Sequence, residues 1–268
     1  IDLTPEADQP ATRARLEGAL AARQGDLATA VKHYEDALAA SARSSDPRRV
    51  RLVVWPLLEI LHELDKDDRA VGIAEQVEKT TLGEAQLDGD PYAPLNHVTP
   101  LLVLARYRAR DIDADGRRNA LEAFTTNRPK TTRPLAAFAW LATWGATSET
   151  KSDAVDAFVR LREDALALPT YAPGVPRLAG RPLRLAGRYD DAVAELEPAS
   201  RSCLALTAPL ADIQARVELG LALEGKKDEA GACAAFQSAL EPFTKAKVLP
   251  LSARRAKKRL AALGCKGS

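Results

Sequence analysis

The sequence predicts an all-α protein built from consecutive helical hairpins. Alanine is the commonest of its 268 residues, whereas aromatic residues make up only 5%. Alanine loses no side-chain entropy in a helix, so this composition favours helix throughout the chain. A signature of small residues on both sides of a turn also recurs along the chain, which indicates helices that pack closely in pairs.

The composition excludes several classes of protein. The 38 Lys and Arg residues against 37 Asp and Glu residues give a net charge of +1, and 46% of the residues are hydrophobic. These values are typical of neither a disordered tail nor a protein whose main partner is a nucleic-acid backbone. The longest apolar runs, such as 101–105 and 135–142, are far shorter than the roughly 20 residues that cross a bilayer. We expect no nucleic-acid partner and no membrane span within this chain.

The first hairpin carries the clearest signature. Two helical patterns within residues 13–38 flank a turn at Gly25-Asp26. Three small residues and one aromatic residue stand where the two helices would cross: Gly18, Ala30, Tyr34 and Ala37.

Two further copies lie later in the chain. One has Gly180, a turn at 187–190, Ala192, Leu196 and Ala199. The other has Gly220, a turn at 225–228, Ala232, Phe236 and Ala239. Weaker copies fill the middle, where Ala70, Ala120 and Ala154 are interpreted as the small residues early in each second helix.

This signature resembles the tetratricopeptide (TPR) repeat, a helix–turn–helix of about 34 residues. The resemblance implies an α-solenoid of about six TPR-like hairpins in a single superhelical domain over residues 1–268. The expected units are 11–44, 47–81, 91–128, 133–168, 173–201 and 207–243. Helical hairpins of another kind, with alanine at their crossings, would reproduce part of the pattern in the middle units.

A single helix over 251–264 is expected to cap the array. Ser252 is the expected N-cap, and Gly264 is the expected residue just after the helix. A solenoid ends in an exposed apolar face, and a lone amphipathic helix would cover it.

A closer resemblance covers the last quarter of the chain. The segments 203–209, 215–224, 231–236 and 261–265 are similar to the C-terminal TPR segments attached to some myxobacterial serine/threonine protein kinases. That resemblance implies a kinase domain upstream and a TPR segment that acts as a sensor or docking module. The chain itself has no Gly-rich phosphate loop after a strand, no His-Arg-Asp and no Asp-Phe-Gly. The catalytic domain would therefore lie outside these residues.

The chain begins at Ile1 and contains no methionine. We therefore expect a mature product or an excised domain, with any targeting segment or neighbouring domain outside it. Its compartment is left open: cytoplasmic, or extracytoplasmic if a membrane-anchored kinase domain precedes it.

The chain lacks the residue patterns of a catalytic or metal site. The three histidines, His33, His62 and His97, fall in different units, and the cysteines have no C-x-x-C spacing. We expect no enzymatic activity, no catalytic residue, no metal site and no cofactor.

Two of the three cysteines are candidates for a disulfide. Cys233 lies early in the second helix of the last hairpin, and a cap helix that runs back antiparallel would bring Cys265 toward the same end. Buried free thiols are the favoured state; a Cys233–Cys265 disulfide is the alternative, and it would suit an extracytoplasmic domain.

The cap helix is strongly basic: it carries Arg254, Arg255, Lys257, Lys258 and Arg259. Such a run is either a patch for nucleic acid or anionic lipid, or a solvated helix face. No aromatic residues interleave and the whole chain is near neutral, which favours the solvated face.

The TPR resemblance also implies where a partner would bind, because the first helix of each TPR hairpin lines the concave groove. The corresponding residues are Arg15, Arg23, Trp55, Glu59, His62, Arg177, Arg181 and Arg184. The last three are spaced to share one face of a helix, and a row of guanidinium groups suits carboxylates or phosphates. The alternative is that these arginines are simply solvated. Pro182 is expected to interrupt their helix and turn Arg184 away.

These observations favour a non-enzymatic scaffold that binds a protein or peptide, with acidic groups on the partner. The scaffold would be the sensory or regulatory docking region of a bacterial signalling kinase. One alternative is a structural or assembly subunit that uses its convex face. The other is an enzyme on an α-solenoid, for which the insertion at 80–99 would supply part of the site.

Overall fold

The computed structural model describes residues 9–41, 47–81, 98–126, 136–137, 140–163, 175–201, 210–244, 246 and 248–265. Within these ranges the protein is all-helical and contains no strand, which confirms the predicted class. The chain divides into two compact units, residues 1–124 with 206–210 and residues 125–205 with 211–268. The single array expected over 1–268 stays a prediction.

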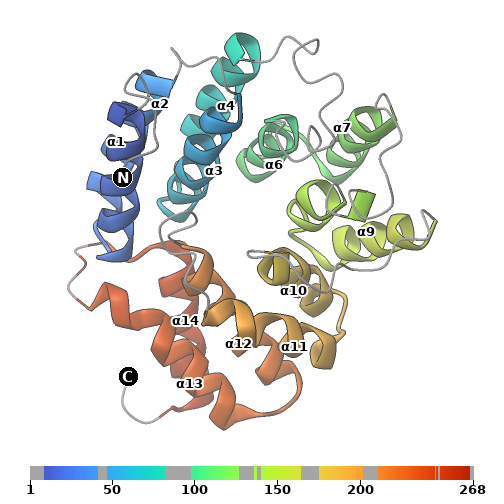
Figure 1. Ribbon diagram of the computed structural model, residues 1–268. Coiled ribbons are helices and arrows are strands. Elements are labelled where there is room, and N and C mark those ends of the chain that lie inside the picture. Colours follow the sequence, from blue (N-terminus) through green and yellow to red (C-terminus); the bar gives the residue numbers. More distant parts are fainter. Residues whose placement is uncertain are drawn as a thin grey trace. The chain divides into compact units, whose positions relative to one another are not determined.

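The first unit contains six α-helices in its described part (Figure 1): α1 (Gln9–Arg23), α2 (Leu27–Ser41), α3 (Pro47–Glu63), α4 (Asp67–Thr81), α6 (Thr99–Ala109) and α7 (Ala114–Thr126). The packed pairs are α1 with α2, α2 with α3, α3 with α4, and α4 with α6, and α3 also contacts α6. From α1 to α6, the described helices that are neighbours in sequence are therefore neighbours in space.

The second unit is built in the same way. It contains a π-helical turn η3 (Leu141–Gly145), α9 (Lys151–Glu163), α10 (Val175–Leu185), α11 (Tyr189–Ser200), α12 (Ala211–Gly225), α13 (Glu229–Leu240), a 3-10 turn η5 (Glu241–Phe243) and α14 (Leu251–Leu263). Consecutive helices pack together from α9 to α14, and α12 also contacts both α10 and α14. The expected units and their assignment to TPR hairpins stay predictions.

Four hairpins share one turn. In each, the second residue after the first helix has a positive φ of 57° to 80°; these residues are Gly25, Asp65, Gly187 and Lys227. The next N–H returns to the carbonyl five residues earlier, as from Asp26 to Ala21 at 3.0 Å. This is the Schellman motif, which ends a helix and sets the direction of the chain that follows.

Three hairpins also share one crossing, in which a glycine of the first helix lies under a large residue sixteen positions later. The pairs are Gly18 with Tyr34, Gly180 with Leu196, and Gly220 with Phe236. A Cβ on these glycines would lie only 2.9, 2.4 and 2.6 Å from the partner side chain. The three large residues are fully buried. The close approach predicted at these positions is confirmed.

The α3–α4 hairpin has the same register with the sizes exchanged. Leu58 stands seven residues before the turn residue Asp65, and the other three hairpins have glycine at the position of Leu58. Ala74 stands sixteen residues after Leu58, at the position of the large residue in those hairpins. Both Leu58 and Ala74 are buried.

The α6–α7 region departs from the predicted register. In most of the hairpins the fourth residue of the second helix is a buried alanine, namely Ala30, Ala70, Ala154, Ala192 and Ala232. In α7 this position is Arg117, which is fully buried, and Ala120 lies one turn later and is only half-buried. The interpretation of Ala120 was wrong: Arg117 stands at the fourth position of α7 and is buried there. The Arg117 guanidinium lies 5.5 Å from the centre of the Tyr107 ring, a cation–π contact.

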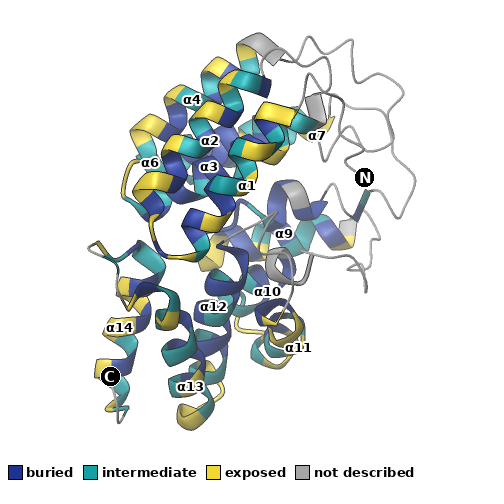
Figure 2. Ribbon diagram, turned by 60° about the vertical axis from the view of Figure 1, so that its left-hand side comes forward, coloured by how far each residue is buried: buried dark blue, intermediate teal, exposed yellow. Residues whose placement is uncertain are grey.

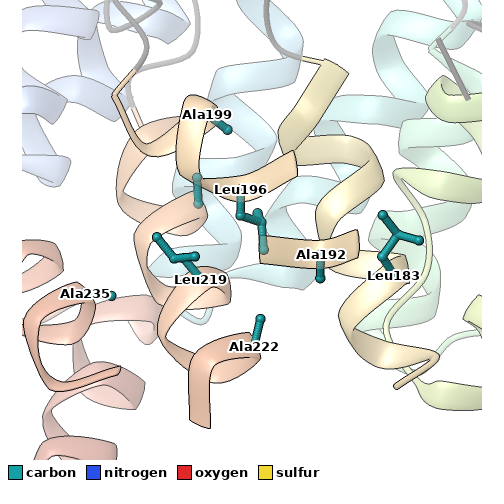
Figure 3. Close-up of a cluster of buried hydrophobic side chains, with 8 residues drawn as sticks. Leu183, Ala192, Leu196, Ala199, Leu219, Ala222 and Ala235 are labelled. Atoms are coloured by element: carbon teal, nitrogen blue, oxygen red, sulfur yellow. The ribbon is translucent and has the colours of Figure 1, made fainter. Parts of the chain in front are cut away.

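The core of the second unit follows from these crossings. Leu183, Leu196 and Leu219 pack with a group of alanines contributed by α11, α12 and α13 (Figure 3). Small side chains bring the helix backbones close, so that a few leucines suffice to fill the space between them.

The helix α14 caps this unit as expected. Ala256 and Leu260 are completely buried against Val217, Phe236 and Ala239, whereas its other face is exposed (Figure 2). Gly264 has a φ of 65° and ends the helix, which confirms its predicted role. The prediction of Ser252 as N-cap was wrong: the helix begins at Leu251, directly after Pro250.

Candidate functional site

The charged side chains of the second unit gather where α10, α12 and α14 meet. Glu218 of α12 is at the centre, and its side chain is 9% exposed. Its carboxylate forms an ion pair with Arg184 and lies 3.8 Å from Nε of Arg181 and 3.5 Å from Nη1 of Arg255. Three guanidinium groups therefore share one buried carboxylate. We call these four residues the Glu218 cluster.

The expected arginine row is only partly as predicted. Arg181 and Arg184 do lie on the same side of α10, but carboxylates of the same chain bind both of them. Arg181 pairs with Glu149 as well as with Glu218, and the Arg184 side chain is only 11% exposed. The side chain of Arg177 lies outside the described residues.

Pro182 does not have the predicted effect. The helix α10 continues through Pro182 to Leu185. The carbonyl of Pro182 accepts a hydrogen bond from the N–H of Ala186 at 2.9 Å. A proline inside a helix removes one backbone donor, and the packing of a buried segment can outweigh that loss. Pro182 is buried, and Arg184 stays directed at Glu218.

An open depression of about 510 Å³ lies beside the Glu218 cluster. Its lining comes from the end of α10, the start of α11, the end of α12 and one side of α14: Arg184, Tyr189, Leu221, Glu224, Gly225, Arg255, Lys258 and Arg259. We call it the basic depression. Four of its eight residues are cationic and one is acidic.

Two contacts hold the walls of the basic depression in place. Nε of Arg259 donates to Oε2 of Glu224 at 2.9 Å, and its Nη2 binds the other oxygen, so that α14 and α12 are joined by a bidentate pair. The Tyr189 ring packs on Gly225, where a Cβ would lie 2.5 Å from the ring. The depression is thus formed by side chains that are already positioned.

The pKa of Arg255 reflects its burial and the charges around it. Burial lowers its pKa; the Glu218 carboxylate raises it, and the guanidinium groups of Arg184 and Arg181 lower it again. Burial is therefore the main cause of the lowered pKa, and the charges around Arg255 act in both directions.

A disulfide joins α13 to the end of α14. Cys233 and Cys265 are bonded, with their Cα atoms 5.8 Å apart. The sequence favoured free thiols over the disulfide, and the structure has the disulfide. Because α14 contributes three of the four cations of the basic depression, this bond also restrains that wall. Cys203 lies outside the described residues.

The groove residues predicted in the first unit fall into two groups. Trp55, Glu59 and His62 follow one another along one side of α3 and are all half-buried. The Arg51 guanidinium lies 5.0 Å from the centre of the Trp55 ring, and Nδ1 of His62 lies 2.9 Å from Oδ1 of Asp67. His62 is therefore held at the turn into α4.

Arg15 and Glu59 both act on the buried side chain of Tyr34. Burial raises the pKa of Tyr34 above its usual range; the charge of Arg15 lowers it, and that of Glu59 raises it. The structure thus brings α1 and α3 groove positions together around α2. Arg23, at the end of α1, is half-buried, and it is not part of this group.

The sequence-based prediction missed Glu149, Glu218 and Glu224, whose carboxylates form ion pairs with Arg181, Arg184 and Arg259. A usable signal was present, because Glu218 follows Arg184 by 34 residues, close to one repeat. The basic cap residues were interpreted as a solvated face. Three of them, Arg255, Lys258 and Arg259, instead line the basic depression, whereas Arg254 and Lys257 do not.

No group of three or more His, Cys, Asp or Glu side chains among the described residues is arranged to hold a metal ion. None of the helices in that part of the chain has the length and apolar character needed to cross a membrane. The insertion considered for an enzyme site, 80–99, lies mostly outside the described residues.

Neither a comparison with protein-family models nor a comparison with curated proteins gives a match. The resemblances to TPR repeats and to kinase-attached TPR segments therefore stay predictions, and function has to be argued from the site.

Proposed function

We propose that this chain is a non-enzymatic, TPR-like scaffold that docks another protein or a peptide. The observation that carries the proposal is the basic depression, an open, preformed surface on packed helices. Its walls are fixed by an ion pair and a tyrosine–glycine contact before any ligand arrives. Preorganisation of this kind reduces the entropy lost on binding.

The surrounding architecture supports the same proposal. Helices stacked in sequence-adjacent pairs offer an extended face, which suits recognition of a peptide or a protein segment. The sequence has no motif for catalysis, and the resemblance to kinase-attached TPR segments supports a scaffold that is part of a larger signalling protein. In that setting the chain would be the docking or sensory region of a kinase.

A peptide-display selection on the folded chain tests this proposal. A library of random dodecapeptides is panned on the disulfide-intact chain, with the reduced and denatured chain as the matched control. We expect a recurrent sequence pattern to be enriched on the folded chain alone, and calorimetry with a synthetic peptide should give saturable binding. Enrichment that is no greater than on the denatured chain would overturn the docking function.

A further inference from the structure

The basic depression has more positive than negative charge. Its four cations face two carboxylates, that of Glu224 in the lining and that of Glu218 beneath it. Extending the count to Arg181 adds one cation and its partner Glu149, so the excess stays at two positive charges. An excess of this size in a concave site favours a ligand with two negative charges.

The excess is located on two residues of α14. The charge of Arg259 is balanced by Glu224, and that of Arg184 by Glu218. Arg255 has only the shared Glu218 at 3.5 Å, and Lys258 has no hydrogen-bond or ion-pair partner in the part of the chain that the structure describes. Arg255 and Lys258 are three residues apart and exposed, so both heads can reach one ligand.

An apolar wall accompanies these cations. Tyr189 and Leu221 line the same depression, and Tyr189 is held by its contact with Gly225. A ligand that carried only charge would leave this wall exposed to water. A short peptide with carboxylates beside one apolar side chain would use both parts of the site.

We propose that the basic depression binds an acidic segment of a partner protein, with two carboxylates on Arg255 and Lys258 and a neighbouring apolar side chain on Tyr189 and Leu221. This inference rests on the proposed docking function and names its ligand. A nucleic acid fits less well, because a phosphodiester backbone is held by many cations spread along its length, whereas the excess here is two cations at one place. The near-neutral net charge of the chain, +1, points the same way.

The test uses the full, oxidised chain and a fluorescein-labelled peptide with the core Asp-Glu-Leu-Asp. The matched probe has the core Asn-Gln-Leu-Asn, which keeps shape and removes charge. Fluorescence anisotropy is measured at two salt concentrations. We expect saturable binding of the acidic peptide, weaker at higher salt, and no saturable binding of the amide peptide.

The decisive variants are two pairs on the same helix. Arg255→Ala with Lys258→Ala removes the two available cations, and we expect binding to weaken about tenfold or more. Arg254→Ala with Lys257→Ala changes the net charge equally outside the depression, and we expect less than about a twofold change. Circular dichroism establishes that both variants keep their helices.

Several results would overturn the inference. They are equal weakening in the two variants, equal binding of the amide peptide, no binding of the acidic peptide, or its displacement by a short DNA duplex or by phosphatidylserine vesicles. If the display selection succeeds but its peptides bind the Arg255→Ala, Lys258→Ala variant normally, docking stands and only this site is wrong. If the selection also fails, the docking function itself is wrong.

Discussion

The hairpins α12–α13 and α3–α4 make the same crossing with opposite residues. In α12–α13 the first helix has Gly220 and the second has Phe236, whereas the equivalent positions of α3–α4 hold Leu58 and Ala74. Phe236, Leu58 and Ala74 are all buried at these crossings. The crossing therefore constrains the combined size of the two residues and not the residue on either helix.

The largest expected effect comes from filling the glycine side of one crossing. Gly220→Leu would place atoms where a Cβ alone is 2.6 Å from the Phe236 ring. We expect the free energy of unfolding to fall by about 3 kcal/mol or more, or the second unit to unfold, because the helices cannot separate without opening the core. Urea unfolding followed by circular dichroism measures this.

Gly72→Leu is the matched control. No atom lies within 4 Å of a Cβ at Gly72, which is also in a helix. Leucine has the higher helix propensity, so stability should be unchanged or rise by up to about 1 kcal/mol. Similar losses at Gly220 and Gly72 would show that glycine is not required by the crossing.

Exchanging the sizes sharpens the comparison further. Phe236→Ala alone should cost about 3–5 kcal/mol because it leaves a cavity. The double variant Gly220→Leu, Phe236→Ala has the arrangement of α3–α4, and we expect it to be more stable than the sum of the two single changes by at least about 1 kcal/mol. Strict additivity in this double-mutant cycle would break the comparison.

A second difference between the hairpins is covalent. The α12–α13 hairpin is joined to α14 by the disulfide, which spans 32 residues, whereas α3–α4 has none. Replacing Cys233 and Cys265 by Ala should lower the free energy of unfolding of the second unit by about 3–4 kcal/mol. The main reason is that the unfolded chain gains conformational entropy when it is no longer cross-linked.

Tryptophan fluorescence can assign that loss to one unit. Trp140 and Trp144 lie in the second unit and Trp55 in the first. In a Trp55→Phe background, fluorescence therefore follows the second unit alone. Cys203→Ala serves as the thiol control. A loss of less than about 1 kcal/mol would mean that packing, and not the disulfide, holds α14.

The shared turn provides a smaller comparison. Gly187 and Lys227 occupy the same position with φ values of 80° and 66°. Gly187→Ala should cost about 1 kcal/mol, because a side chain disfavours this conformation, whereas Lys227→Gly should be neutral or gain up to about 1 kcal/mol. Thermal unfolding of both variants measures the difference. A loss in both would show that Lys227 stabilises its turn through its side chain.

The fold could be predicted from sequence wherever its determinants are local. Turn glycines, and the sixteen-residue spacing from Gly18 to Tyr34, are set within one hairpin. The register of α7 could not be predicted, because Arg117 takes the place that alanine has in other hairpins, and its burial beside the Tyr107 ring depends on packing. The site was half-predicted: Arg181 and Arg184 were found, but Glu218 acts on them from the next hairpin, and that contact depends on packing between repeats.

The smallest expected effect separates two residues that fill the same crossing, Tyr34 in α1–α2 and Phe236 in α12–α13. The Tyr34 hydroxyl is buried and has no hydrogen-bond partner in the part of the chain described. Tyr34→Phe removes an unsatisfied polar group, so stability at pH 7 should be unchanged or rise by up to about 1 kcal/mol.

The pH dependence of that variant tests the cause. The pKa of Tyr34 is raised in the folded state, first by burial and then by Glu59, so the folded chain holds this proton more tightly than the unfolded chain. Its contribution is therefore complete below the unfolded pKa of about 10 and is lost as the pH rises above it. Urea midpoints of the wild type should fall more steeply than those of Tyr34→Phe between about pH 9 and pH 11. Parallel curves would mean that folding does not raise the pKa of Tyr34, and that its hydroxyl is in contact with solvent.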